Sequence, residues 1–400
     1  MENTAGALLA LSPAGSHPPA TSAGSMRVLH FYKTYKPDSM GGVEELIGQI
    51  CSGAAKRGVT SEVLTVSKDT STVDFGDHLH YRAKLDVEIA SSAFSLAAFR
   101  RFRELAEHAD LIHYHFPWPF ADVVHFASRV HKPSIVTYHS DIVRQKVLLQ
   151  FYKPLRDRFL ASVDKIVATS PNYLATSEVL QRYRDKVEVI PIGLDETLYA
   201  TPTAEKLQYW RERAGPKFFL FVGNLRYYKG LHVLLDALPG TEFRVVIVGS
   251  GPVERELRAQ AERLKLNNVD FVGPVGDDDK IALLTLCHAL TFPSHLRSEA
   301  FGISLLEAAM FGKAMISTEI GTGTSYVNVD GETGLVVPPS DPEALRGAMG
   351  RLWGDDALAT KLGAKARERF QAKFTAEKMV DGYVDLYRRL ANASGAATVR

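Results

Sequence analysis

The chain has 400 residues, 46% hydrophobic and 23% charged, which indicates globular material with room for two or three domains. Its 47 Lys and Arg against 46 Asp and Glu give a net charge of +1, which argues against a dedicated nucleic-acid-binding protein, since those carry a basic excess. Cys51 and Cys287 lie far apart and match no metal or redox spacing, so a reducing, cytoplasmic compartment is the simplest interpretation.

The first 25 residues contain a short apolar stretch with no positive charge before it. A secretory signal needs that charge, and no apolar run in the chain approaches the roughly 18 residues that cross a bilayer. We therefore expect residues 1–25 to be a disordered or expression-derived tail, with folded structure beginning near Met26.

From Arg27 onward, short β-branched and aromatic runs alternate with helical patterns, six runs in each half of the chain. This alternation predicts an α/β protein with parallel sheets covered by helices on both faces. This alternation of strand and helix patterns is interrupted between Asp195 and Lys217, where the sequence is rich in prolines and polar residues. The predicted units are an N-terminal domain, a linker, a C-terminal domain and a helix that packs back on the first domain: 26–200, 201–216, 217–374 and 375–400.

Open α/β sheets bind ligands at the carboxyl ends of their strands. We therefore expect the site in the cleft between the two domains. The segment Val248–Glu254, "VGSGPVE", follows a predicted strand but has Glu254 where a dinucleotide fingerprint requires its third glycine. The sequence also contains neither a P-loop nor a nucleophile-elbow motif, so it predicts neither of these two kinds of chemistry.

Two patterns could hold a metal. Asp277 and Asp279 form a DxD that could bind Mg²⁺ on a diphosphate, but both directly precede an apolar helical pattern, where carboxylates cap free N–H groups, and we favour the cap. Several histidines lack the spacing of a zinc site: His113, His115, His125, His131 and His139. We therefore expect no metal and no cofactor.

Glu299 and Glu307 stand eight residues apart, the first in a predicted loop and the second inside an apolar helix. Eight helical residues span roughly 12 Å, whereas the two carboxylates of a glycosidase stand about 5–9.5 Å apart. The spacing suits the two ends of one extended ligand. A solvated acid beside a helix-start acid is the plainer alternative.

Three further segments fall at the predicted cleft. Gly41 and Gly42 precede a helix, where bare N–H groups favour phosphate. Arg226 and Lys229 follow the first strand of the second domain, and His139 ends a strand of the first. Each has an ordinary alternative as a helix-capping loop, a solvated cation pair or a satisfied histidine. Their joint occurrence at one cleft favours a binding site.

With these residues in place, the chain resembles glycosyltransferase family 4, the retaining enzymes of GT-B architecture, over residues 26–390. The most specific element is the pair Glu299 and Glu307, supported by "VGNLRYYKG" and "DGETGLVVPPSD". The resemblance implies two Rossmann-like, doubly wound domains facing an interdomain cleft, with the nucleotide-sugar held mainly by the second domain.

By position, the resemblance implies that Glu299 holds donor-sugar hydroxyls, Glu307 the ribose and Lys229 the diphosphate. It implies that Gly42 lies against phosphate and His139 beside the donor sugar, so that Glu299, His139, Lys229 and Arg226 are the expected catalytic residues. The remaining implied donor contacts are Gly41, Asn224, Val275, Phe301, Gly302 and Ile303.

Three positions depart from the family pattern. Asn224 stands where arginine is usual, with Arg226 two residues later as the candidate replacement for its charge. Thr322 replaces a glycine, and Tyr326 stands where glutamate is common. These departures bear on the phosphate and sugar contacts.

The segments "FYKTYKPDSMGGVE" and "EIGTGTSYVN" are most similar to bacterial mannosyl- and D-rhamnosyltransferases that build surface polysaccharides from GDP-sugars. This likeness implies metal-independent, retaining transfer of mannose or D-rhamnose to a hydroxyl of a glycan or lipid-linked glycan. A nucleotide-sugar epimerase on the same fold and a non-catalytic nucleotide-sugar-binding subunit are the alternatives.

The segment Arg144–Leu160 mixes basic and apolar residues and predicts peripheral contact with the anionic inner face of the cytoplasmic membrane. An ordinary solvated helix face is the alternative. The residues concerned are Arg144, Lys146, Lys153, Arg156 and Arg158 with Val147, Leu148 and Phe151.

Overall fold

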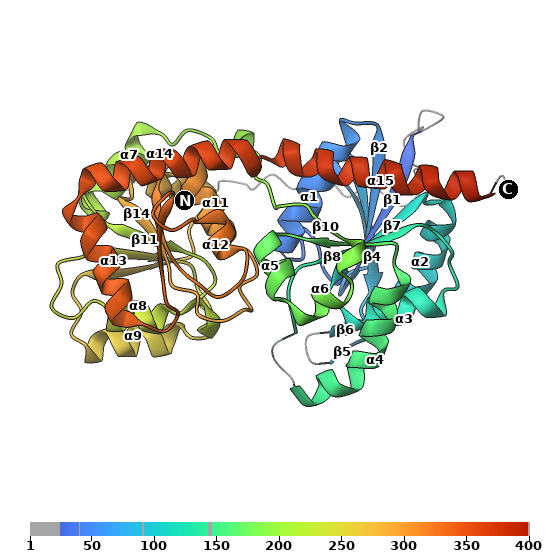
Figure 1. Ribbon diagram of the computed structural model, residues 1–400, viewed down its shortest axis with the longest axis horizontal. Helices are drawn as coiled ribbons and strands as arrows, with labels where there is room; N and C mark the ends of the chain where they lie inside the picture. Colours follow the sequence, from blue (N-terminus) through green and yellow to red (C-terminus); the bar gives the residue numbers. More distant parts are fainter. Residues whose placement is uncertain (1–24, 40, 90–91, 143–145, 399–400) are drawn as a thin grey trace, which may run out of the picture.

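The computed structural model describes residues 25–39, 41–89, 92–142 and 146–398, so the tail expected at 1–25 lies almost wholly outside the described residues. Two helix-covered sheets lie side by side, and the C-terminal helices run along one edge of both (Figure 1).

The first sheet has eight strands in the order β10-β9-β8-β7-β1-β2-β4-β3, and every neighbouring pair is parallel except β3 with β4. Six of the strands were expected from the sequence. The other two, β3 and β4, are an edge strand with exposed residues and a strand that carries two histidines, so neither reads as an apolar run. The strands are β1 Met26–Phe31, β2 Val59–Ser67, β3 Ser71–Asp74, β4 His78–Lys84, β7 Leu111–Phe116, β8 Ser134–Tyr138, β9 Lys165–Ala168 and β10 Val187–Val189.

Helices cover both faces of this sheet, and a small antiparallel hairpin lies at its lower end in Figure 1. The helices are α1 Gly42–Ala55, α2 Leu96–His108, α3 Pro119–Ala127, α4 Lys146–Ser162, α5 Pro171–Thr176 and α6 Glu178–Arg182, and the hairpin strands are β5 Val87–Ile89 and β6 Ser92–Phe94.

The second sheet has six strands, all parallel, in the order β13-β12-β11-β14-β15-β16, and each was expected from the sequence. The strands are β11 Phe219–Val222, β12 Val245–Val248, β13 Val269–Gly273, β14 Ala289–Phe292, β15 Ala314–Thr318 and β16 Gly334–Val337. The helices are α8 Leu231–Asp236, α9 Glu254–Arg263, α10 Asp277–Leu286, α11 Ile303–Met310, α12 Thr324–Val327, α13 Pro342–Gly354 and α14 Asp356–Lys373.

The chain passes between the domains twice, and the two crossings touch. Leu194 forms an isolated parallel bridge with Thr375, and a Cβ at Gly193 would lie 2.2 Å from the carbonyl oxygen of Thr375, so only glycine fits there. After the second crossing, α15 (Ala376–Thr398) packs against α1 of the first domain. The segment expected to be a linker contains a helix, α7 (Ala204–Ala214), which packs on α10.

The acidic start of α10 corrects one prediction. The N-cap is Gly276 and no side chain caps the helix, because the helix begins at Asp277 and the acids occupy its first turn. There they still favour the helix dipole. The carboxylate of Asp279 instead accepts from Lys206 at 2.7 Å and from the indole N–H of Trp210 at 2.9 Å.

Four histidines crowd the middle of the first sheet. His30, His113 and His115 are essentially unexposed on β1 and β7, and His139 follows β8. Burial lowers the pKa of all four, that of His30 and of His139 to about 3. The unfolded chain therefore binds more protons below pH 6.5 than the folded chain does, so the stabilisation is complete above pH 6.5 and is lost as the pH falls towards 3.

We expect acidification to destabilise the fold through these histidines, by up to about 1.4 kcal/mol per histidine for each pH unit below 6.5. The melting temperature should fall between pH 7.5 and pH 5, and His30→Phe should reduce that fall. His131→Gln, at an exposed position, is the matched control and should behave as wild type. An identical pH dependence in His30→Phe and wild type would contradict the assignment.

Candidate active site

The carboxyl ends of the two sheets face each other, so the loops after the strands meet between the domains. On the first domain these are the loops after β1 and β8, and on the second those after β11, β14 and β15. Two contacts bring them together. Ala300 packs against the core of the first domain, and a Cβ on Gly42 would lie 3.4 Å from Cγ1 of Ile303.

A cation and a carboxylate meet where β11 and β14 end. Gly230 has a φ of 70°, and a Cβ there would lie 1.9 Å from the carbonyl oxygen of Pro293, so this glycine lets one loop lie directly on the other. As a result the ammonium of Lys229 forms an ion pair with Oε2 of Glu299, whose side chain is 10% exposed. The Ser294 hydroxyl donates to the same oxygen at 3.2 Å.

The other glutamate of the pair, Glu307, has a different set of partners. Its Oε1 accepts from the hydroxyl of Tyr199 at 3.0 Å and forms an ion pair with Lys280 at 3.0 Å. Burial lowers the pKa of Lys280, but the carboxylates of Glu307 and Asp277 together more than offset this and the net shift is upward. Oε2 of Glu307 has no hydrogen-bond partner among the described residues. One oxygen is thus anchored while the other is free for a ligand.

Two helices, one from each domain, begin at this meeting point without side-chain caps. The N-cap of α1 is Gly41 and that of α11 is Gly302, which has a φ of 92°. Their first residues, Gly42 and Ile303, are the pair that nearly touch. Uncapped N–H groups and the positive ends of two helix dipoles favour an anion. Lys229 pairs with Glu299 in the loop that leads into α11, so a cation is also at hand and the geometry suits a phosphate.

His139 stands at the end of β8, partly exposed. Its backbone N–H donates to the carbonyl of Phe116 at 3.0 Å, and its Nε2 lies 3.1 Å from Nδ1 of His115. Its Nδ1 has no protein partner within the described part of the chain. The ring is thus held through Nε2, and Nδ1 is available to a ligand.

The other expected donor contacts differ in how they are presented. Asn224 and Arg226 are exposed, and Arg226 forms no ion pair with any described residue. Val275 is half-buried against the core. The ring of Phe301 is only 3% exposed and packs edge-on against Phe374, which leaves only its backbone for a ligand.

The two remaining departures from the family pattern are also accounted for by packing. Tyr326 lies edge-on to Phe374 and under the guanidinium of Arg369 at 5.2 Å, so its ring is engaged with the end of α14. Thr322 is fully buried, with its hydroxyl 3.4 Å from that of Thr324.

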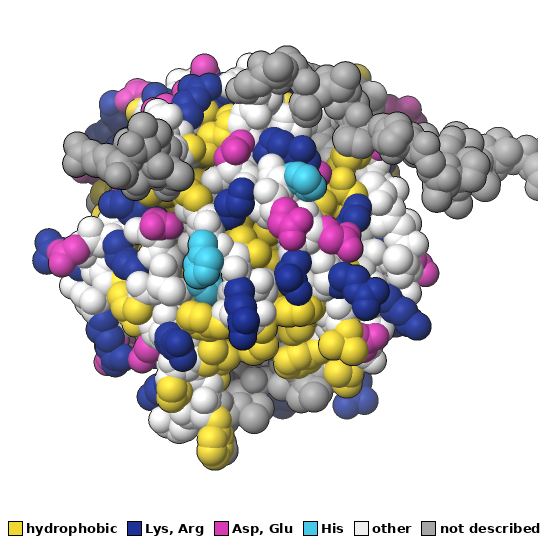
Figure 2. Space-filling model, turned by 90° about the vertical axis from the view of Figure 1, so that its right-hand side faces the viewer, with side chains coloured by type: hydrophobic (Ala, Val, Ile, Leu, Met, Phe, Trp, Pro, Cys, Tyr) yellow, Lys and Arg dark blue, Asp and Glu magenta, His cyan; other side chains and the backbone are white. Residues whose placement is uncertain are grey.

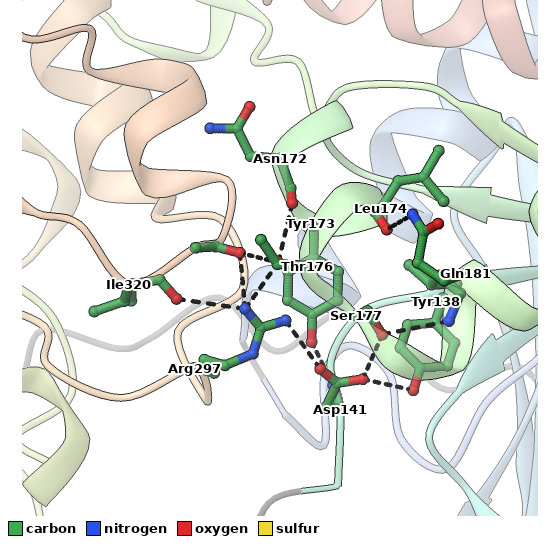
Figure 3. A network of polar contacts seen from close by, with 12 residues as sticks. Tyr138, Asp141, Asn172, Tyr173, Leu174, Thr176, Ser177, Gln181, Arg297 and Ile320 are labelled. Carbon is green, nitrogen blue, oxygen red and sulfur yellow. Dashed lines mark hydrogen bonds and ion pairs between the residues drawn. The ribbon is translucent and has the colours of Figure 1, made fainter.

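An arginine that the sequence reasoning missed joins the domains at the rim of the site (Figure 3). The guanidinium of Arg297, just before Glu299, donates to Asp141 of the first domain at 3.2 Å and to Thr176 at 2.8 Å. Tyr138 and Ser177 donate to the other oxygen of Asp141. No motif links positions this far apart, but the buried ends of β8 and β14 place them opposite each other.

Two missed lysines differ in whether the sequence offered a signal. Lys33 follows β1, and its charge adds to burial in lowering the pKa of His139, so it lies near the site and the strand-end rule that identified Lys229 also applies to it. Lys280 lies within an acid-rich helix start, a pattern that predicts a cap and does not point to a ligand.

A cavity of 740 Å³ lies between the first domain and the two chain crossings, but none of the predicted site residues lines it. It is formed by the outer part of α1 and by the two chain crossings, around Glu45, Glu196 and Thr375. Three cations line it, but Lys36 pairs with Glu45 and Arg57 pairs with Asp381, while Lys56 is the third. Because neither Glu299 nor Glu307 reaches this cavity, we assign the chemistry to the facing strand ends.

Two facing Rossmann-like domains with a site between them define the GT-B class of fold. Family models match both halves: "Glycosyltransferase Family 4" over residues 40–198 and "Glycosyl transferases group 1" over residues 203–369. The sucrose-phosphate synthase of Thermosynechococcus elongatus superposes with a TM-score of 0.77 at 22% identity, covering 92% of this chain and 100% of that one. This last likeness concerns the fold alone.

Two relatives span nearly the whole chain. The D-rhamnosyltransferase WbpZ of Pseudomonas aeruginosa is 59% identical over 353 residues, 88% of this chain and 93% of the relative. The O-antigen chain mannosyltransferase C of Escherichia coli is 50% identical over 367 residues, 91% of this chain and 99% of the relative. The chain therefore belongs to glycosyltransferase family 4, as its motifs had indicated, and it is a glycosyltransferase.

We expect neutralisation of the two glutamates to affect different properties, nucleotide binding in one case and turnover in the other. Glu307→Gln should weaken binding of free nucleotide about 10- to 100-fold, because a charge-assisted hydrogen bond contributes about 1.5–3 kcal/mol. Glu299→Gln should mainly lower kcat, since a contact to the reacting sugar counts in the transition state. Nucleotide titration and steady-state kinetics measure the two effects.

Glu254→Gln on α9 is the control and should change neither quantity, because among the described residues this carboxylate pairs with Arg258 alone. Full turnover in Glu299→Gln, or normal nucleotide binding in Glu307→Gln, would show that the two residues do not hold opposite ends of one donor.

Proposed function

We propose that this glycosyltransferase moves mannose or D-rhamnose from a GDP-sugar to a hydroxyl of a glycan or lipid-linked glycan, with retention of configuration, in the synthesis of a bacterial surface polysaccharide. The observation that carries the proposal is the approach of two uncapped helix N-termini, at Gly42 and Ile303, with Glu299, the ion-pair partner of Lys229, in the loop that leads into α11. The choice of sugar draws on the names of the two nearly full-length relatives.

In this proposal the diphosphate lies by Lys229 and the amides of Gly42 and Ile303. These fixed positive groups stabilise the charge that develops as the bond between the anomeric carbon and the phosphate oxygen breaks. The acceptor hydroxyl attacks the anomeric carbon from the face that the phosphate leaves. A new carbon–oxygen bond forms, and the departing phosphate takes the hydroxyl proton. Lys229 then exchanges its present partner, Glu299, for the diphosphate, which frees Glu299 for sugar hydroxyls.

We expect GDP to raise the melting temperature more than UDP or ADP at equal concentration, because a ligand that binds only the folded state stabilises it by mass action. A thermal-shift series measures this directly. A larger shift with UDP than with GDP would exclude a GDP-sugar as the donor.

We expect transfer to proceed without a divalent cation. The two DxD carboxylates have separate partners, since Asp279 is engaged by Lys206 and Trp210 while Asp277 pairs with Lys280, so they do not share one ligand site. Transfer in excess EDTA should match the untreated rate. Loss of most activity, restored by Mg²⁺ or Mn²⁺, would require a metal in the mechanism.

We further propose that the end of the first domain near α4 contacts the cytoplasmic face of an anionic membrane. Among the described side chains there, the most exposed apolar ones are Leu96 at the start of α2, 82% exposed, and Phe151 on α4, 81% exposed. Hydrophobic side chains gather at the lower part of this end of the molecule, with Lys and Arg side chains beside them (Figure 2). Such a mixture suits a lipid surface. Among the described residues, no helix has the length and apolarity needed to cross a bilayer.

The prediction that Arg156 belongs to this surface is wrong. Arg156 is 5% exposed and pairs with Asp157 at 2.6 Å, because α4 packs on α3, where a buried carboxylate, Asp122, attracts the cation. Arg144 lies outside the described residues, as do the side chains of Lys146, Val147 and Leu148.

We expect the double variant Leu96→Ser, Phe151→Ser to float less with anionic liposomes at low salt than wild type does. Leu198→Ser, which removes a side chain 60% exposed beside the chain crossing, is the control and should float normally. Absence of wild-type binding at low salt would rule out this contact.

A further inference from the structure

Three histidines of the first domain form a row that ends at the candidate active site. Nε2 of His139 lies 3.1 Å from Nδ1 of His115, and Nε2 of His115 lies 3.2 Å from Nδ1 of His30. The ring centres are 5.3 and 5.5 Å apart and the planes differ by 13° and 17°. Adjacent rings are therefore nearly coplanar and meet edge to edge, as two hydrogen bonds in line require. We call His30, His115 and His139 the histidine row.

The row runs from the core to the cleft. His30 and His115 are buried, with 0% and 1% exposure, whereas His139 is partly exposed at the end of β8. Burial lowers the pKa of all three, so each ring is neutral near pH 7. A neutral imidazole donates from one nitrogen and accepts at the other. The direction of one hydrogen bond in the row therefore fixes the direction of the next.

The inner end of the row decides that direction. Nε2 of His30 is buried and has no hydrogen-bond partner. If the bonds ran inwards from His139, this atom would be an N–H donor buried without an acceptor. If they run outwards from His30, it is an unprotonated nitrogen, and a buried unpaired acceptor is tolerated more often than a buried unpaired N–H. The outward direction leaves His139 with its proton on Nδ1.

We propose that His115 and His30 are positioning residues that hold His139 as its Nδ1–H tautomer, so that it presents a hydrogen-bond donor to the cleft. Nδ1 is the atom of His139 left without a protein partner in the described structure. If the proposed function holds, the acceptor of this N–H is an oxygen of the donor sugar. The opposite tautomer would present a lone pair there and could only accept from a hydroxyl.

A metal site is the competing interpretation, because nitrogens of His30, His113 and His115 all lie within 4.8 Å of one another. The rings of His113 and His115 stack with centres 4.2 Å apart and planes at 27°, so their lone pairs run side by side and do not converge on one ion. Both nitrogens of His113 are also engaged, by the hydroxyls of Tyr387 and Thr137 at 2.7 Å each. The contacts favour hydrogen bonds over a metal.

The tautomer can be measured directly on wild-type protein labelled with ¹⁵N-histidine, using long-range ¹H–¹⁵N correlation spectra at pH 7.5. The signals of His139 are those absent from His139→Ala. We expect the Nδ1–H pattern, and an Nε2–H pattern would overturn the proposal. Stoichiometric Zn²⁺ should leave the row unchanged, and a shift of the His30 and His115 signals to metal-bound values would also overturn it. No donor is needed, so an error in the proposed function leaves this test intact.

Kinetics then tests whether the row acts through His139. His115→Phe keeps the ring volume and removes both hydrogen bonds, so His139 should no longer be restricted to one tautomer, and kcat should fall about two- to tenfold. In a His139→Ala background the same change should have no further effect. His125→Phe is the control, because His125 bonds Tyr114 and Ser162 outside the row and should leave both the tautomer and kcat unchanged. An equal loss of kcat from His115→Phe in both backgrounds would overturn the positioning role.

Discussion

Parallel pairing of the strands is the constraint on which the rest of this molecule depends. It makes every strand of each large sheet, apart from the edge strand β3, end at the same side of the sheet. Each domain therefore gathers its loop residues at the carboxyl ends of its strands and leaves the other ends to chain returns. Because the two sheets present these strand ends to each other, residues as distant in the sequence as Asp141 and Arg297 come into contact. The crossings at Leu194 and Thr375 keep this arrangement by holding the two connecting segments against each other.

Close approach of backbone segments then determines which side chains meet. Gly230 lets the loop after β11 lie on the loop after β14, and this places Lys229 on Glu299. A buried ion pair of this kind is weak evidence for stability, because both charges lose their hydration. Its value here is that the ammonium is held in place before a phosphate arrives, so little reorganisation remains for the reaction. Arg297 and Asp141 hold the domains together at the same rim.

Much of the fold could be predicted, because buried parallel strands leave continuous apolar runs that alternate with helical patterns. The edge strand β3 and its neighbour β4 leave no such run, since β3 is half exposed and β4 carries His78 and His80. For the site, strand-end rules and the spacing of Glu299 and Glu307 identified residues that the structure brings together. The pairing of Arg297 with Asp141, the burial of Arg156 and the inward ring of Phe301 depend on tertiary packing, which local patterns do not encode.

The central claim is that the donor lies between the facing strand ends, and a crystal structure of the complex with GDP tests it most directly. The diphosphate should lie beside Lys229, between the starts of α1 and α11, with the ribose on Oε2 of Glu307. Nucleotide bound instead in the 740 Å³ cavity at the chain crossings, away from both glutamates, would contradict the account.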